Sequence, residues 1–600
     1  MIVPMIKYSF LVYHRDFNSF LSKLQELGVV DISKENRTVD EEEKAIINQI
    51  NRYSNALRFF ETRTPSEEKI TLSMDADDVI SRLDILQKER EQFDNSIKKS
   101  QKELAEVKPW GNFDQSLIHK LSDKGIKIRY FAIPEKSFNV EWLQEYPIEI
   151  ISTESGLVFF VLIDSGDIQI PADFQEVRQP QFSCKFKEDE INRYLGKIDE
   201  IEKEIDFLAS YNQVIKKSQT ELINSLEFKV VSSSADKQAG ESVMVLQGWV
   251  PEPQNQDLVN FLEQESVIYI SEKALPQDNA PILLKNNRFA KLFEPITRLF
   301  SFPMYAELDL TPFFAPFYML FFGFCFGDAG YGILFVIVAT IYKFKASQTV
   351  KPILSLVQFL GIAAVIFGAL TGTVFGYDLA ETQIPALVQY KSFFLDKNTM
   401  FYSSMAIGFV QIIFGMCVKA ANQWIQFGWK YSVSTIGWVI FLLSSAIFAV
   451  LGKVRPELGL TAFGPIHLVI IGIAGLAIMF YNSPGKNPFM NFGTGLWDSY
   501  NMATGLLGDI LSYIRLFALG LSGGILGGVF NSLAFGMAPD LPVAKQIVIV
   551  LILLIGHGIN IFMSALGSLV HPVRLTFVEF YKNAGFVGGG KEYEPFQRKQ

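Results

Sequence analysis

Two very long apolar segments near the end of this chain, each containing an arginine, limit what it can fold into. The first covers residues 499–537 with Arg515 near its middle, and the second covers residues 543–581 and contains Arg574. As a helix, the first segment would be roughly 55 Å long, against ~30 Å for the hydrocarbon core of a membrane. A charged side chain inside a membrane helix is costly and usually marks a function. We therefore predict two long, tilted membrane helices with functional arginines.

The helix face around Arg515 consists of small residues. Helical steps of three and four from Arg515 reach Gly508, Ser512, Ala518 and Ser522. Small residues let another helix come very close. The sequence therefore predicts that this face meets a partner helix. The alternative for either arginine is that it snorkels to a lipid headgroup or pairs within the helix bundle.

The second segment has a polar stripe on one face of an apolar helix. Its members follow one another at spacings of 3, 4, 3, 4 and 3: His557, Asn560, Ser564, Gly567, His571 and Arg574. Such a stripe predicts a water-filled path for an ion. The alternative is that these groups hydrogen-bond neighbouring helices, which pack in membranes through such residues.

Two carboxylates complete the candidate ion-translocating set. Asp328 interrupts a long apolar run within the sequence GDAGYG, and Glu579 follows Arg574 by five residues. Asp328 could instead cap the start of a helix, and Glu579 could be solvated near a helix end. Asp509 precedes Arg515 by six residues, about 120° around the helix, so we expect the two to lie on different faces.

The sequences SYIRLFALGLSGG and HPVRLTFVEFYKNAGFVGGGKEYEPF carry a family resemblance. The chain resembles the membrane subunit of V/A-type rotary ATPases, called subunit I in prokaryotes and subunit a in eukaryotes. The resemblance implies a non-catalytic stator subunit in the plasma membrane of a prokaryote. It also implies a proteolipid rotor ring, peripheral-stalk subunits and a central-stalk attachment subunit as partners. Eukaryotic relatives have a histidine where this chain has Gly523 and a glutamate where it has Ser564. The residues that line their exit half-channel therefore cannot be assigned to this chain by resemblance.

The first half of the chain, residues 1–310, has an ordinary charged composition and is expected to be a cytoplasmic stator arm. Alternating apolar residues predict strands at 6–13, 29–32, 126–133, 148–151, 158–163, 243–250 and 267–270. Heptad-like spacing predicts long helices at 75–107 and 191–226. We expect a near lobe from 1–35 and 229–275, an antiparallel helical hairpin from about 40–108 and 185–228, and a far lobe at 109–184.

The second half, residues 311–600, is expected to be an all-α transmembrane domain. Apolar runs occur at 311–343, 353–376, 401–424, 432–452, 464–481, 499–537 and 543–582. If the first run is two spans, the lysine-rich loop at 343–351 lies on the same side as the N-terminus, as the positive-inside tendency favours. This arrangement gives eight crossings with both termini cytoplasmic. The resemblance implies the same count.

The sequence thus predicts a multidomain membrane protein, with an α+β arm followed by a helix bundle. An arginine facing a small-residue surface favours the ionised form of a carboxylate that slides past it. That carboxylate must come from a partner, because this chain has no rotating ring of its own. A secondary transporter and a passive membrane anchor are the competing classes. The sequence has no nucleotide loop, no metal-ligand spacing and no basic patch for nucleic acid, and we expect no cofactor.

Overall fold

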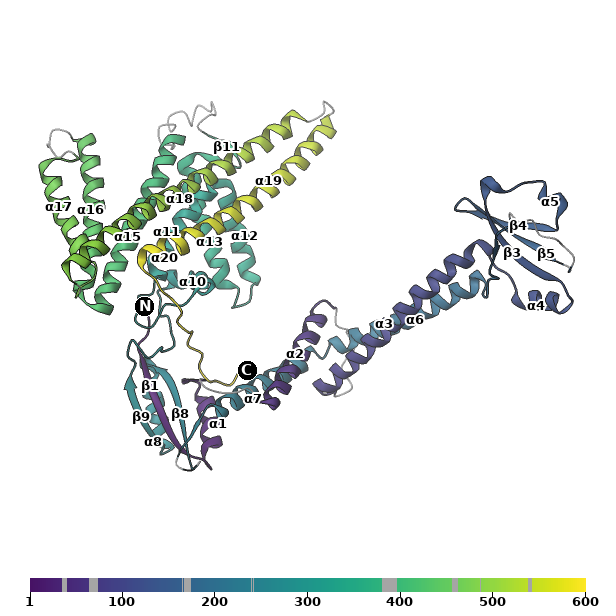
Figure 1. Cartoon of the computed structure of the whole chain (residues 1–600), viewed down its shortest axis with the longest axis horizontal. Helices are drawn as coiled ribbons and strands as arrows, with labels where there is room; N and C mark the ends of the chain where they lie inside the picture. Colours follow the sequence, from purple (N-terminus) through teal and green to yellow (C-terminus); the bar gives the residue numbers. More distant parts are fainter. Residues whose placement is uncertain are drawn as a thin grey trace. The chain divides into compact units, whose positions relative to one another are not determined.

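The computed structural model describes residues 1–34, 40–63, 74–164, 166, 174–238, 240, 242–379, 396–455, 462–485, 487–537 and 542–599. These residues form two compact units. The first consists of Met1–Phe20, Leu27–Ser33 and Asp236–Phe596, and the second consists chiefly of Lys34–Ala235. The near lobe therefore belongs to the same unit as the membrane helices, and the helical hairpin belongs to the same unit as the far lobe (Figure 1).

The near lobe is an antiparallel sheet covered by helices. Its strands are β1 (Met5–Tyr13), β2 (Asp31–Ile32), β7 (Asp236–Gln238), β8 (Val243–Pro251) and β9 (Ile268–Lys273). The order is β2-β8-β1-β9, with β7 also paired to β8. Two helices, α1 (Phe17–Leu27) and α8 (Asn255–Gln264), contribute Phe20 and Phe261 to a ring cluster with Phe10 of β1. Strands from both ends of the soluble half thus share one sheet.

The hairpin of the second unit is built from four helices. They are α2 (Glu41–Glu61), α3 (Ala76–Val107), α6 (Cys184–Ala209) and α7 (Asn212–Ser233), and one apolar core runs through all four. The sequence predicted a single helix over 191–226, whereas the structure breaks it at Ser210 and Tyr211. The Ser210 hydroxyl donates to the Phe207 carbonyl, and the buried Tyr211 ring packs into the core. Local capping thus outweighs the continuous apolar repeat.

The far lobe is a four-stranded antiparallel sheet with short helices. Its strands, in spatial order, are β4 (Ile148–Glu154), β5 (Leu157–Asp164), β3 (Lys127–Pro134) and β6 (Glu176–Val177). Its short helices are α4 (Gln115–Asp123) and α5 (Trp142–Glu145). Ser155 and Gly156 both have positive φ and form the tight turn between β4 and β5. The rings of Phe131, Phe160 and Phe174 form the core.

A buried tyrosine ties α2 to α3 in the hairpin. The Tyr53 hydroxyl donates to Asp77 at 2.8 Å, and burial together with this carboxylate raises the pKa of Tyr53 to about 12. Because the folded pKa is raised, the stabilisation is complete below pH 10 and is lost as the pH rises through 12. We expect Tyr53→Phe to lower the unfolding free energy of a 40–235 fragment by about 1 kcal/mol in urea at pH 8. Equal unfolding free energies of the variant and unmodified fragments at pH 8 would contradict this prediction. In the full chain, the matched control is the same substitution at the exposed Tyr13.

The second half of the chain is a bundle of apolar helices. Its main helices are α11 (Thr311–Phe326), α12 (Ala329–Lys345), α13 (Lys351–Thr371), α15 (Lys397–Phe427), α16 (Trp429–Val454), α17 (Pro465–Phe480), α18 (Pro488–Gly536) and α19 (Pro542–Arg574). Among the described residues, five helices are long and apolar enough to cross a membrane, and α11 and α17 are shorter apolar helices. The break between α11 and α12 falls at Gly327 and Asp328, where the sequence predicted it. The count of eight crossings stays a prediction.

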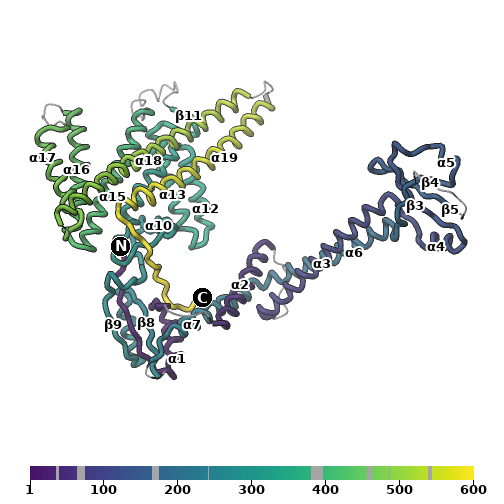
Figure 2. Tube along the Cα trace, in the orientation of Figure 1, coloured from purple at the N-terminus to yellow at the C-terminus, as the bar shows by residue number. Residues whose placement is uncertain are grey.

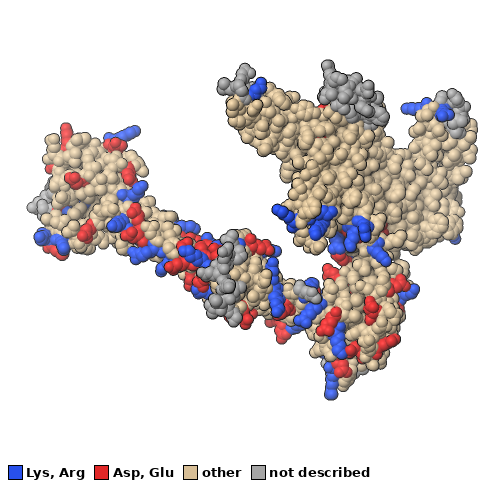
Figure 3. Space-filling view, turned by 180° about the vertical axis from the view of Figure 1, so that it is seen from behind, with Lys and Arg blue, Asp and Glu red and all other residues tan. Residues whose placement is uncertain are grey.

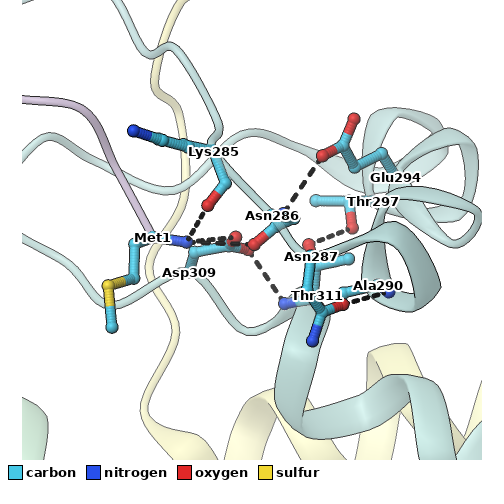
Figure 4. Close-up of polar contacts among 9 residues, drawn as sticks. All are labelled: Met1, Lys285, Asn286, Asn287, Ala290, Glu294, Thr297, Asp309 and Thr311. Carbon is cyan, nitrogen blue, oxygen red and sulfur yellow. Dashed lines mark hydrogen bonds and ion pairs between the residues drawn. The ribbon is translucent and has the colours of Figure 1, made fainter.

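The charged residues of the first unit are unevenly distributed. Figure 3 shows the helix bundle as a largely uncharged surface, with lysine and arginine side chains gathered along the edge next to the near lobe. Figure 4 shows how the chain is tied together at this edge. Asp309 is 4% exposed, pairs with the Met1 amino group at 3.2 Å and accepts from the Thr311 backbone N–H at 2.9 Å. The first residue of the near lobe is thus bonded to the start of α11.

The last residues of the first unit run back to the near lobe. After α20 (Tyr581–Ala584) the chain descends to the sheet, as Figure 2 shows. Glu307 accepts from the backbone N–H groups of Val587 and Gly588, and the Phe596 N–H donates to the Val30 carbonyl. The Tyr593 hydroxyl donates to the Val29 carbonyl. This segment therefore ties the end of the last membrane helix to the near lobe.

Candidate ion-translocation site

Arg515 lies at the edge between the buried and exposed faces of α18. On one side of it Leu516 and Gly520 are buried in the bundle. On the other side the predicted small-residue face opens outward, because Gly508, Ala518 and Ser522 are exposed and Ser512 is half-buried. A methyl group added at Gly508 would touch nothing within 4 Å. Within the described residues Nη1 of Arg515 is buried and has no hydrogen-bond partner, so this nitrogen has an unmet capacity to donate.

A cluster of polar side chains lies on the N-terminal side of Arg515 along α18. Asp509 is 7% exposed and accepts from Lys582 Nζ at 3.0 Å and from Asn583 Nδ2 at 2.8 Å. Glu579 is 1% exposed, so the alternative that it is solvated is wrong. Ser512 is a hydrogen-bond partner of Glu579, and the charges of Asp509 and Arg515 both act on it. Its Oε2 has no partner among the described residues.

The end of α19 departs from a regular α-helix beside the second arginine. Pro572 lies inside the helix, where it removes one backbone hydrogen bond. After Arg574, the six residues Leu575–Phe580 are wound as a π-helix, a form that often occurs at functional sites. No sequence pattern indicated this segment. Glu579 within it is buried, while Arg574 is exposed.

Asp328 occupies the break between α11 and α12. It is 1% exposed and accepts three backbone N–H groups: Tyr331 at 3.1 Å, Phe375 at 2.9 Å and Gly376 at 2.8 Å. The last two belong to the short hairpin of β10 (Thr373–Val374) and β11 (Tyr377–Asp378). This geometry is that of a helix cap that also holds a neighbouring loop, which supports the capping alternative. A role in ion translocation stays a prediction.

The outer part of the polar stripe, toward the N-terminal end of α19, is hydrogen-bonded to neighbouring helices. Asn560 is fully buried and its Nδ2 donates to the Tyr331 hydroxyl and to the Gly523 carbonyl, both at 3.0 Å. Ser564 donates to Asn560 Oδ1 at 3.3 Å. These bonds support the alternative of packed helix contacts for this part of the stripe. Nearer Arg515, Gly567 and His571 are half-buried.

His571 lies closest to the arginines along the stripe. The charges of Arg515 and Arg574 both act on it. Within the described residues its Nδ1 is buried without a hydrogen-bond partner. The inner end of the stripe, toward the C-terminal end of α19, therefore has a free polar atom close to Arg515, unlike the outer end.

A cavity of about 530 Å³ lies beside the C-terminal third of α18. Its walls are the β10–β11 hairpin, the start of α15 and α18. Polar lining side chains include Thr371, Thr373, Asp378, Lys397, Asn531 and Ser532. The cavity lies at the end of α18 that the predicted topology places outside. Among the described residues, no group of three or more His, Cys, Asp or Glu side chains is arranged to hold a metal ion.

Comparison with known proteins gives a consistent family. Residues 212–352 match the model of the V-type ATPase 116kDa subunit family. The chain is 26% identical to V-type ATP synthase subunit I of Borreliella burgdorferi over 82% of each chain. It is 28% identical to A-type ATP synthase subunit I of Methanocaldococcus jannaschii over 66% of this chain and 61% of that one. A Chlamydia pneumoniae V-type ATP synthase subunit I is 23% identical over 98% and 96%.

These matches confirm the resemblance to subunit I of V/A-type rotary ATPases and support a membrane subunit of such a complex. A crystal structure of the cytoplasmic N-terminal domain of a subunit I, the homolog of subunit a of V-ATPase, covers 45% of this chain and 100% of that one. The identity is 18% and the TM-score 0.22, so this likeness carries no argument.

Several residues that bond to the candidate site are not among those that the sequence patterns marked. Tyr331 and Asn531 bond to the polar stripe, and Lys582 and Asn583 bond to Asp509. Asn531 is an amide in the apolar C-terminal part of α18, and such a polar residue could have been noticed by the same rule that marked Arg515. The partnership of Asp509 with Lys582 spans 73 residues and left no signal in either segment.

Proposed function

We propose that this chain is the stator subunit that guides ions past the rotor ring of a V/A-type rotary ATPase. The observation that carries the proposal is the position of the half-buried Arg515 beside an exposed face of small residues. One of its nitrogens has no hydrogen-bond partner among the described residues. A helix bearing a carboxylate could slide along this face within reach of the guanidinium. The positive charge would favour the ionised carboxylate by a factor of roughly 10–1000 and so release its ion.

The inner route for the ion starts from the carboxylates beside Arg515. Glu579 has a free oxygen in a buried site, and Asp509 lies between it and the half-exposed Lys582. A proton released at Arg515 could pass to Glu579 and leave past Asp509. The basic edge of the bundle supports a cytoplasmic location for this end, together with the arm and both termini.

The outer route combines the cavity beside α18 with the polar stripe of α19. The cavity supplies a polar vestibule, and Asn531 in its wall bonds to His557 at the outer end of the stripe. From there Asn560, Ser564 and Gly567 lead to His571, beside Arg515. The arginine separates the two routes, which prevents an ion from leaking straight through. We further propose that the far lobe anchors peripheral-stalk subunits and the near lobe lies near the central-stalk attachment.

The test is a cysteine cross-link between this subunit and the proteolipid ring in native membranes. After replacement of Cys184, Cys325 and Cys417, we expect Ala518→Cys to form a disulfide with a cysteine beside the ring carboxylate. The matched control is Ile337→Cys, an exposed position on α12, which should not cross-link. Cross-linking only from the control position would reject the proposed rotor-facing surface. A chain that transports ions without a ring would favour a secondary transporter, and normal coupling without Arg515 would favour a passive anchor.

A further inference from the structure

A closed set of hydrogen bonds joins four segments at the middle of α19, where the polar stripe begins. His557 Nδ1 lies 2.6 Å from the Tyr331 hydroxyl of α12, and His557 Nε2 lies 3.1 Å from Asn531 Oδ1 of α18. Asn531 Nδ2 donates to the Phe375 carbonyl at 2.9 Å, which adds the β10–β11 hairpin. Tyr331 and Asn531 are 1% and 4% exposed, so these bonds are buried.

The bonding partners determine the form of the histidine. Asn531 gives its amide N–H to Phe375, so its oxygen faces His557 and requires a donor, which is Nε2–H. Nδ1 then has a lone pair and accepts the Tyr331 O–H, while the Tyr331 oxygen accepts from Asn560. Every group in the set is satisfied when His557 is neutral.

Adding a proton to His557 breaks this arrangement. Nδ1–H and the Tyr331 O–H would then be two donors facing each other, and the hydroxyl hydrogen would lose its acceptor. A buried donor without an acceptor is unfavourable. The ionisable groups facing His557 are Tyr331 on α12 and Asp328, which caps the start of α12. Asn531 on α18 and Phe375 of the hairpin are uncharged.

The same set separates the outer cavity from the polar stripe. Asn531 lines the cavity on one side and bonds to His557 on the other. The hairpin that it holds packs tightly on α18, because a methyl group at Gly376 would lie 2.4 Å from a backbone carbon of Gly527. Asp328 fixes the hairpin from the far side through Phe375 and Gly376. Within the described residues, this set therefore lies between the cavity and the rest of the stripe.

We propose that His557 is a pH-sensitive latch that keeps the outer cavity closed off from the polar stripe when neutral and opens the connection when protonated. The proposal rests on the proposed outer route and adds its regulation. Histidine changes charge between about pH 5 and 8, the range in which an outer medium acidified by pumping would act on it. Acid outside would then admit protons to the stripe and favour ion flow inward.

The test compares the accessibility of two cysteines from the outer side, in membranes that contain the assembled complex. Ser564→Cys reports on the stripe and Ser532→Cys on the cavity wall, each in a chain lacking Cys184, Cys325 and Cys417. The rate of reaction with a membrane-impermeant methanethiosulfonate is measured at pH 8 and pH 5.5. Dividing the Ser564→Cys rate by the Ser532→Cys rate removes the effect of pH on thiol reactivity.

We expect this ratio to rise at least about tenfold on going from pH 8 to pH 5.5. His557→Gln can keep both hydrogen bonds without titrating and should hold the ratio constant. Tyr331→Phe removes the O–H and should raise the ratio already at pH 8. A ratio that does not change with pH in chains with unmodified His557 would overturn the proposal. So would an equal rise of the ratio in the His557→Gln background. An unreactive Ser532→Cys would instead reject the cavity as an outer vestibule, and the latch with it.

Discussion

Replacing Arg515 by lysine is expected to lower ATP-driven ion transport by at least about tenfold, because an arginine's fixed charge and planar fork cannot be supplied by an ammonium. The matched substitution Arg574→Lys is expected to keep most of the activity. The two arginines differ in surroundings: Arg515 is half-buried with one buried, unpartnered nitrogen, whereas Arg574 is exposed at the end of α19. Transport is measured in membrane vesicles with ATP, with the ATPase rate recorded in parallel.

Loss of transport in Arg515→Lys has to be separated from loss of assembly. The rotor ring should therefore co-purify with both variants in equal amounts, since neither substitution removes a packed apolar group. An Arg515→Lys complex that assembles and pumps at the unmodified rate would show that this side chain does not discharge the rotor carboxylate. Equal losses in both variants would contradict the ranking of the two arginines.

Features of the site that depend on a single segment were predictable from the sequence. A lone arginine in an apolar run is visible without a structure, and so is the spacing of small residues around it. The exposure of Gly508, Ala518 and Ser522 follows from helical periodicity, because a helix has one fixed angular step per residue. The break at Gly327 was likewise local, since its φ of 53° suits glycine.

Features that join distant segments could not be read from the sequence. Asp328 was noticed as an ionisable residue, but its partners Phe375 and Gly376 lie 47 and 48 residues away. They belong to a hairpin that no sequence pattern indicated. Glu579 was noticed too, yet its burial near Asp509 and Arg515 depends on packing between α18 and the end of α19, two segments far apart in the sequence. The tertiary packing in each case selects between roles that the residue type leaves open.

A very tight contact between two helix backbones lies next to Asp328, and it leads to the second large effect. A methyl group at Gly368 of α13 would lie 2.0 Å from the backbone nitrogen of Ala329 and 2.6 Å from the carbonyl carbon of Asp328. These are backbone atoms at the start of α12, so no side-chain rotation can relieve the clash. Gly368→Ala must therefore push α13 away from α12 and disturb the cap that holds the β10–β11 hairpin.

We expect Gly368→Ala to destabilise the protein by about 3 kcal/mol, the upper end of the usual range for overpacking. That loss should lower the thermal midpoint of the purified protein in detergent by roughly 2–4 °C, because the entropy of unfolding grows with chain length. Disturbing the hairpin should also open the polar stripe, so the Ser564→Cys rate in this background should rise at pH 8. The thermal midpoint is measured by the loss of monodisperse protein on heating.

The matched control is Gly472→Ala in α17, another glycine inside an apolar helix. A methyl group there would meet nothing within 4 Å, so only the change in backbone conformational entropy affects stability. Alanine loses less conformational entropy than glycine in a helix, which predicts no loss and a gain of up to about 1 kcal/mol. The two variants change the same atoms in the same type of element, so opposite signs would isolate the helix contact. If the Gly368→Ala and Gly472→Ala variants had the same thermal midpoint, the tight contact between α12 and α13 would be contradicted. The fixed position of Asp328 would then be contradicted too.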